Sequence, residues 1–288
     1  MIEDVIIGGI LLGGIYILVA AGLSLIFGVM KIINIAHGEF LILSAYIGYW
    51  LYILFNVNPF ISIIITSIAL AGTGIILQKF FLNSLVKRGV DPPLLFTFGL
   101  SLVLQNAMTV VWTADVRGIL FETGTFKVPV INAAVSLVRF EAFLAGIAAA
   151  IILRTFLMKT YIGKAIRATA QDWEAAYLMG INVERVNIIS FAVGAAFAAT
   201  AGVFIGITFA FEPTSGLHFY LLKAMAIIVL GGVGSLGGLV AGSFLVGLLE
   251  SLGSFFIGSG FRDAIVYIIF LLALIVRPQG IVARVRTW

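Results

Sequence analysis

Long uncharged stretches, separated by short charged ones, make up most of this chain of 288 residues. Five stretches contain no Asp, Glu, Lys or Arg, and each exceeds the roughly 20 apolar residues that a helix needs to cross a bilayer. They are residues 5–30, 40–78, 92–114, 186–211 and 224–249. The run 40–78 is too long for one crossing, and Asn56-Val57-Asn58-Pro59 divides it with residues typical of a turn. This pattern predicts an all-α, polytopic membrane protein.

The apolar segments predict nine transmembrane helices in a helical bundle. Their approximate ranges are 5–29, 38–56, 60–78, 94–113, 140–158, 187–210, 219–233, 237–257 and 263–277. Three of these segments, 140–158, 219–233 and 263–277, are short or carry a charge, so the predicted number of crossings is eight to ten. We treat residues 1–288 as a single transmembrane domain.

The composition agrees with this fold class. Hydrophobic residues make up 62% of the chain and charged residues 10%, and the mean hydropathy is +1.20, whereas about a quarter of the residues in a soluble domain are charged. The net charge of +4 is expected from basic residues in the loops of a membrane protein, so it indicates no nucleic-acid partner. Because cysteine is absent, disulfide bonds and thiolate metal sites are excluded.

Lysine and arginine are distributed unequally between alternate loops. The loops after the first, third, fifth and seventh predicted helices, together with the C-terminal segment, contain eleven of them, and the opposite loops contain four. Because cytoplasmic loops carry the excess of Lys and Arg, this bias predicts the N-terminus outside the cell and the C-terminus in the cytoplasm. Residues 113–139 then form the main external loop, and residues 159–186 form the main cytoplasmic loop.

The predicted cytoplasmic loop, 159–186, has the composition of two short helices joined by a turn. Asp172 is suited to cap the second helix, and Glu174 would lie in its first turn, where the helix dipole favours a negative charge. Gly180 is a natural residue to end that helix. Such a helix–turn–helix fits a groove on a partner protein, but the composition by itself favours an ordinary amphipathic connector.

A polar cluster interrupts the apolar sequence between the first two predicted helices. Asn34, His37 and Glu39 lie within six residues, and Gly28 and Gly38 would allow the helix to break here. Ionisable groups inside a bilayer usually face the bundle interior or water, so the cluster is a candidate lining for a translocation path. The alternative is a hydrated loop at the membrane surface.

The second half of the chain has a similar interruption. A glycine-rich segment, 231–238, corresponds to the segment 28–40, and paired broken helices in the two halves of a transporter indicate a path at the membrane midplane. Glu250 is the one charged residue of the predicted helix 237–257, so it either lines the path or bonds to a neighbouring helix. We expect Lys223 to extend its amine toward the membrane surface.

Several of these segments resemble the permeases of branched-chain amino acid ABC transporters. Glu174-Ala175-Ala176 followed by Gly180 matches the EAA-xxx-G core of ABC-importer permeases, although the Ile-x-Leu-Pro that often ends that motif is absent from residues 186–192. Gly22-Leu-Ser-Leu-Ile-Phe-Gly28 and Ile33-Asn-Ile-Ala-His-Gly-Glu39 are similar to the signature of the first half of that family. The resemblance covers about residues 8–282 and is weakest over 113–139.

The resemblance implies a permease subunit in the inner or plasma membrane of a prokaryotic cell, which imports Leu, Ile, Val or similar apolar amino acids. It implies a homologous second permease subunit, two ABC ATPase subunits and an external solute-binding protein as partners. The residues that would contact the ATPase are Asp172, Glu174, Ala175, Ala176 and Gly180. The residues that would line the translocation path are Asn34, His37, Gly38, Glu39 and Glu250.

The chain lacks the G-x-x-x-x-G-K-[ST] phosphate-binding loop, so we expect ATP and Mg to be bound by the partner ATPase and no cofactor by this chain. We predict no enzyme activity, no catalytic residue and no metal site in it. Two alternatives stay open. One is a permease of the same superfamily for urea, an amide or a sugar, and the other is an ion-coupled secondary transporter in which His37, Glu39 and Glu250 relay protons or ions.

Overall fold

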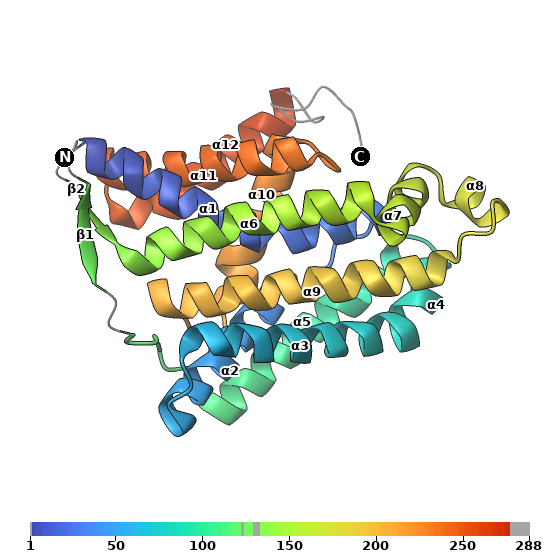
Figure 1. Cartoon of the computed structure of the whole chain (residues 1–288), viewed down its shortest axis with the longest axis horizontal. Helices are drawn as coiled ribbons and strands as arrows, with labels where there is room; N and C mark the ends of the chain where they lie inside the picture. The colour runs from blue at the N-terminus through green and yellow to red at the C-terminus, as the bar shows by residue number, and fades with distance from the viewer. Residues whose placement is uncertain (1, 122–123, 129–132, 277–288) are drawn as a thin grey trace.

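The computed structural model describes residues 2–121, 124–128 and 133–276, so the predicted basic C-terminal segment and parts of the predicted 113–139 loop lie outside the described residues. Each predicted membrane segment contains a helix (Figure 1). These helices are α1 (Ile2–Met30), α2 (His37–Phe55), α3 (Pro59–Leu77), α5 (Asp91–Trp112), α6 (Leu137–Lys159), α9 (Val183–Thr208), α10 (Leu222–Gly231), α11 (Leu236–Phe256) and α12 (Arg262–Val276).

Seven of the described helices are long and apolar enough to cross a membrane, one fewer than the lower end of the predicted range. They are α1, α2, α3 with its continuation to Val86, α5, α6, α9 and α11. The continuation of α3 consists of a π-helical turn, η1 (Gln78–Leu82), and α4 (Asn83–Val86). The chain is therefore a multi-pass integral membrane protein, as predicted.

The two other predicted crossings, 219–233 and 263–277, correspond to short helices. The π-helical turn η2 (Gly216–Leu221) adds six residues to the ten of α10, and α12 has 15 residues up to Val276, where the described part of the chain ends. In Figure 1, α10 runs across the direction of the long helices rather than along it. Its apolar sequence therefore reflects burial among other helices, which sequence alone does not distinguish from a crossing.

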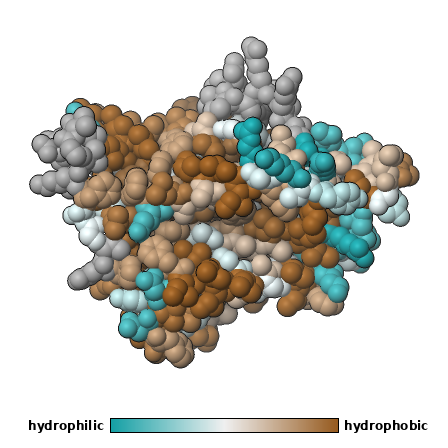
Figure 2. Space-filling model, viewed as in Figure 1, coloured by the Kyte–Doolittle hydropathy of each residue, from teal (hydrophilic) through white to brown (hydrophobic). Residues whose placement is uncertain are grey.

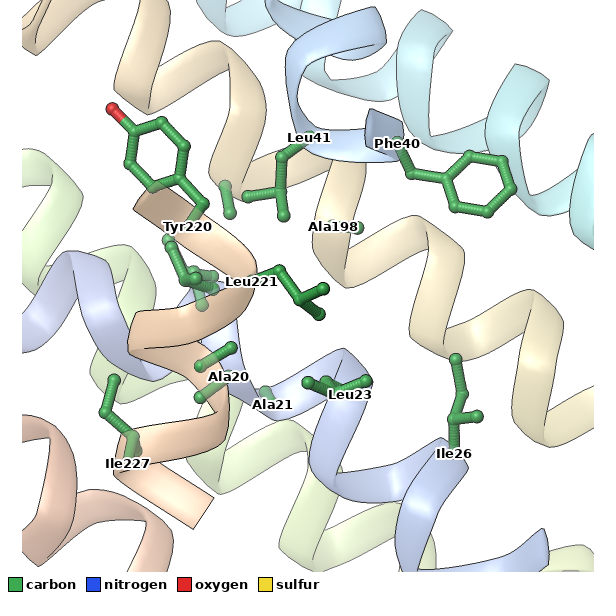
Figure 3. Packing of buried hydrophobic residues seen from close by; sticks show 14 of the residues in the cluster. Ala20, Ala21, Leu23, Ile26, Phe40, Leu41, Ala198, Tyr220, Leu221 and Ile227 are labelled. Atoms are coloured by element: carbon green, nitrogen blue, oxygen red, sulfur yellow. The ribbon is translucent and has the colours of Figure 1, made fainter. Parts of the chain in front are cut away.

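Helix α1 is the centre of the bundle. It is apolar all round and packs against α6, α9, α10 and α11, as expected for a helix that is surrounded by protein. Ala20, Ala21 and Leu23 of α1 lie in one buried cluster with Ile227 of α10 and Leu41 of α2 (Figure 3). The buried face of this helix supports the start of α2, where the polar cluster lies.

Close approach of helix backbones holds α1 against its neighbours. A Cβ atom on Gly146 of α6 would lie 2.0 Å from the carbonyl oxygen of Gly14, and one on Gly247 of α11 would lie 2.5 Å from that of Gly9. Small residues allow this approach, which gives the dispersion contacts that hold membrane helices together.

The outer helices have lipid-facing surfaces. Large apolar side chains such as Ile64, Ile68 and Val103 of α3 and α5 are more than half exposed. Hydrophobic residues cover much of the surface in Figure 2, and hydrophilic residues gather at the end that holds α7 (Tyr161–Gln171) and α8 (Trp173–Leu178). This distribution is expected for a bundle whose middle faces hydrocarbon.

The segment 113–139, the predicted external loop, contains two short strands beside the helical bundle. Strands β1 (Thr125–Val128) and β2 (Ala133–Ser136) form an antiparallel pair, with Thr125 opposite Ser136. The short sequence Thr-Phe-Lys-Val alternates between polar and apolar residues, which is the period of a strand. This hairpin and the α7–α8 segment lie at opposite ends of the bundle (Figure 1), and which end faces the cytoplasm stays a prediction.

Candidate functional site

The chain breaks its helix between α1 and α2, as predicted. Helix α1 ends at Met30, Lys31 has a positive φ of 54°, and α2 begins at His37. The segment between them is non-helical but enters the bundle, where Ile32 and Asn34 are buried. Non-helical backbone at membrane depth is tolerated only where protein or a cavity surrounds it.

Thr97 of α5 holds this broken segment. Its Oγ1 atom accepts a hydrogen bond from the backbone N–H of Ile35 at 3.3 Å and lies 3.3 Å from the carbonyl oxygen of Ile33, to which it can donate. Thr97 is completely buried, and its Oγ1 atom also lies 3.1 Å from the carbonyl oxygen of Leu94 in α5, which competes for the single hydroxyl proton. Its hydroxyl therefore satisfies the N–H group of Ile35, which a continuous helix would otherwise bond.

The polar side chains of the segment are inside the protein. Asn34, His37 and Glu39 each have 0% of their surface exposed, so the alternative of a hydrated surface loop is wrong. The Nε2–H group of His37 donates to the carbonyl oxygen of Val19 at 3.0 Å. Gly22 leaves room for the imidazole, because a Cβ atom there would lie 2.9 Å from His37 Cε1.

Glu39 connects three elements. Its Oε1 atom accepts hydrogen bonds from Ser101 Oγ of α5 at 3.3 Å and from the backbone N–H of Leu217 in η2 at 3.1 Å. Gly38 makes the approach of η2 possible, since a Cβ atom on it would lie 2.1 Å from the carbonyl oxygen of Gly216. The first turn of α2 is thereby fixed against η2.

Four polar atoms of this cluster have no hydrogen-bond partner among the described residues. They are both amide atoms of Asn34, Nδ1 of His37 and Oε2 of Glu39. Most buried polar groups in proteins are paired, and an unpaired one has a cost unless a ligand or water satisfies it. Such a set within six residues gives the site free donors and acceptors for a small polar molecule.

Glu250 lies in a different cluster, which we call the ion cluster: Tyr16, Lys223, Glu250, Arg262 and Asp263. Its carboxylate accepts hydrogen bonds from the Tyr16 hydroxyl and from Lys223 Nζ, the latter at 3.1 Å, and pairs with Arg262. Lys223 also pairs with Asp263 at 2.7 Å. The ion cluster joins α1, α10, α11 and α12, so Glu250 bonds to neighbouring helices.

The prediction that Lys223 extends to the membrane surface is wrong. The residue is 5% exposed, because the carboxylates of Glu250 and Asp263 hold its ammonium group inside the bundle. No hydrogen bond or ion pair links Glu250 to Asn34, His37 or Glu39 in the part of the chain that the structure describes. The five predicted path residues therefore form two separate groups.

The segment 159–186 contains the predicted helix–turn–helix, α7 and α8. Asp172 Oδ1 caps α8 by accepting hydrogen bonds from the backbone N–H groups of Glu174 and Ala175 at 2.9 and 3.0 Å. Gly180 follows α8 with a φ of +83°, a conformation that favours glycine. Ala176 is buried, whereas Glu174 and Ala175 are exposed.

Helix α8 projects from the end of the bundle (Figure 1) and carries exposed apolar side chains. Trp173 and Tyr177 are 56% and 68% exposed, and Leu178 and Met179 are each 83% exposed. A contiguous exposed apolar patch marks an interaction surface. Helix α7 connects this patch to the bundle, where it packs against α6, α1 and α9.

Comparison with known proteins adds to this geometry. The model of a family described as the permease component of branched-chain amino acid transport systems matches residues 5–274. The chain belongs to this family. No solved structure gives a significant match to it.

Relatives of this permease cover nearly its whole length. It is 28% identical to the high-affinity branched-chain amino acid transport system permease protein BraD of Pseudomonas aeruginosa, over 97% of this chain and 95% of that protein. It is 29% identical to the corresponding protein LivH of Escherichia coli K12, over 96% and 94%. The autoinducer 2 import system permease protein LsrC of Escherichia coli is 27% identical over only 57% of this chain.

The sequence of this permease did not reveal the distant partners of its buried polar groups. Thr97 and Ser101 are four residues apart in an apolar helix and would share one face, a pattern that could have indicated them. Tyr16 carries no such signal, because a tyrosine in an apolar helix is an ordinary packing residue. Arg262 and Asp263 mark the start of α12, and only the fold places them beside Glu250.

Proposed function

We propose that this chain is a transmembrane subunit of an ATP-driven importer for Leu, Ile, Val or similar apolar amino acids, in the inner or plasma membrane of a prokaryotic cell. The observation that carries this proposal is the family match over residues 5–274. The relatives from Pseudomonas aeruginosa and Escherichia coli are permeases of branched-chain amino acid transport systems and cover almost the full chain. The permease of an autoinducer 2 import system matches only 57% of this chain, so a substrate of that kind is the weaker choice.

The proposed importer contains four partner proteins besides this chain, and they are of three kinds. A homologous second permease completes the path, two ABC ATPases bind and hydrolyse ATP with Mg, and an external solute-binding protein delivers the amino acid. This chain has no phosphate-binding loop of the G-x-x-x-x-G-K-[ST] type. The exposed apolar residues of α8 supply a surface for an ATPase, and Asp172 and Gly180 fix the shape of that surface.

Contacts within the bundle suggest how motion at α8 reaches the path. Helix α7 packs against α1, and α1 leads directly into the broken segment 31–36. A shift of α8 on an ATPase would therefore change the position of the segment that carries Asn34 and His37. Alternating access needs a path with two accessible states, and ATP hydrolysis supplies the direction between them.

The broken segment provides the polar groups of the proposed path. An α-amino acid carries a positive ammonium and a negative carboxylate group, which must exchange water for protein partners inside the membrane. Asn34 offers donors and acceptors, and Glu39 offers an unpaired carboxylate oxygen. Gly38 lets η2 approach this point, so that a small movement of η2 relative to α2 would open or close it.

Purification of the tagged chain from native membranes in mild detergent tests the proposed assembly. We expect an ATPase and a second permease of similar size to co-purify, identified by mass spectrometry. Recovery of the chain alone, or only with copies of itself, would contradict the proposal and favour the ion-coupled transporter.

A further inference from the structure

A cavity of about 420 Å³ lies at the end of the bundle where α1 begins. Its apolar lining includes Leu12 and Ile15 of α1, Phe209 and Phe255. Its charged lining consists of Arg139, Glu250 and Arg262. Sites for small molecules typically have volumes of about 300–1,000 Å³ and combine an apolar wall with a few polar groups, so this cavity has the form of a small-ligand site.

The charges of the cavity are incompletely paired. Within the ion cluster, the two carboxylates of Glu250 and Asp263 balance the two cations of Lys223 and Arg262. Arg139, in the first turn of α6, makes no hydrogen bond or ion pair with the described residues. Among the described residues, the cavity therefore has one guanidinium group, at the exposed Arg139, without a carboxylate partner, and this group would favour a carboxylate.

Glu250 also retains bonding capacity. A carboxylate offers about four acceptor positions, and the Tyr16 hydroxyl, Lys223 Nζ and Arg262 occupy three of them. The remaining position can accept a hydrogen bond from an ammonium group. Since Glu250 is completely buried, a cation that reaches it from the cavity is screened little by water.

We propose that this cavity binds a zwitterionic α-amino acid with an apolar side chain. Arg139 binds the carboxylate, Glu250 accepts from the ammonium group, and the side chain contacts Leu12, Ile15 and Phe255. The inference rests on the proposed function, and it adds an entry site that is separate from the broken segment of α1 and α2.

Arg262 is placed to control passage out of this site. A second cavity, of about 280 Å³, is lined by Tyr16, Lys223 and Asp263, and both cavities share Phe209 and Arg262. The guanidinium carbon of Arg262 lies 5.3 Å from the centre of the Phe209 ring, within the range of a cation–π contact. A shift of Arg262 would join the two cavities, because its side chain is part of the wall of each.

Saturation-transfer NMR on the purified permease–ATPase complex in nanodiscs of neutral lipid, without the binding protein, tests the proposal. The ligands are L-leucine, 4-methylpentanoate, which lacks the ammonium group, and 3-methylbutylamine, which lacks the carboxylate. We expect leucine to bind at least about tenfold more tightly than either analogue, as the loss of one charge-assisted hydrogen bond predicts. Equal binding of all three would overturn the proposal.

Arg139→Gln is the decisive variant. It should weaken leucine binding about tenfold and leave the binding of 3-methylbutylamine unchanged, because the amine has no carboxylate for Arg139 to bind. Arg154→Gln, on the exposed surface of the same helix and outside the cavity lining, is the matched control and should bind leucine normally. Unchanged leucine binding by Arg139→Gln would overturn the proposal.

Co-purification of an ATPase distinguishes a failure of the proposed entry site from a failure of the proposed function. If the ATPase is present and its activity responds to leucine-loaded binding protein, but Arg139→Gln binds leucine normally, the entry site is wrong and the importer stands. If no ATPase is present, the proposed function itself fails. A lipid of the nanodisc could instead bind at Arg139. Its headgroup would then contact Arg139 and the leucine signal would be lost. This result would also overturn the proposal.

Discussion

Individual buried residues carry the polar chemistry of this protein. Glu39 is held by Ser101 and Leu217 through one carboxylate oxygen, and its other oxygen has no partner among the described residues. Glu250, in contrast, is bonded to Tyr16 and to the cations of the ion cluster. Glu250 is therefore bonded more fully inside the bundle than Glu39, and substitutions at the two positions should differ in their effect on stability.

Glu39→Gln should reduce amino acid uptake about tenfold or more, because a hydrogen bond to a charged group contributes about 1.5–3 kcal/mol. The amide oxygen of Gln can still accept from Ser101 and Leu217, so the thermal unfolding temperature should stay close to that of the original protein. Uptake into membrane vesicles and thermal unfolding in detergent measure the two effects. Glu3→Gln, at an exposed position of α1, is the control. Normal uptake by Glu39→Gln would show that Glu39 does not take part in the translocation path.

Glu250→Leu should lower the free energy of unfolding by about 3–5 kcal/mol, since it leaves Lys223 and Arg262 with one carboxylate between them inside the bundle. Glu184→Leu is the matched control. Glu184 pairs with Lys87 at 2.6 Å, but both side chains are more than half exposed, so its loss should cost about 0–1 kcal/mol. Denaturant unfolding in micelles compares the two variants, and equal losses would show that the ion cluster does not stabilise the bundle.

At the scale of elements, local patterns in the sequence were sufficient for much of the structure. The uncharged runs predicted the positions of the helices, and glycine and polar residues predicted the break at 31–36. Asp172 and Gly180 predicted the two ends of α8. The strand pair in 113–139 and the direction of α10 were not predicted, because short strands and buried helices have weak signals in a single sequence.

The candidate site was predicted less completely than the fold. Asn34, His37 and Glu39 stand out as polar residues in apolar surroundings. Their partners Val19, Ser101 and Leu217 come from helices that are 18, 62 and 178 residues away in the chain. Contacts over such separations depend on how the helices pack, which the local pattern does not contain. The same reason explains why Lys223 was assigned to the membrane surface.

Gly180→Val should disrupt the segment after α8. A β-branched side chain is strained at a φ of +83°, so the chain would leave α8 in a different direction and displace its exposed apolar residues. We expect ATPase co-purification to fall about tenfold or more while the amount of permease in the membrane is unchanged. Gly72→Val, in α3 where a Cβ atom meets open space, is the control. Full ATPase recovery with Gly180→Val would contradict the proposed docking role of α8.

At the scale of the whole molecule, the structure combines an enclosed central helix with two interruptions of helical structure. Helix α1 is enclosed by four other helices, and the breaks at 31–36 and after Gly231 lie next to the elements α2, η2 and α10. Helix α8 and the N-terminus lie at opposite ends of the bundle (Figure 1). The cavity that Arg139 lines is also lined by Val5 and Gly8, near the start of α1.

Uptake of radiolabelled leucine into liposomes tests whether ATP drives transport by this permease. The liposomes contain the purified complex, the binding protein is outside, and ATP is enclosed or omitted. We predict that uptake requires enclosed ATP and continues when an uncoupler collapses the proton gradient. Uptake that proceeds without ATP and stops with the uncoupler would contradict it and identify an ion-coupled transporter.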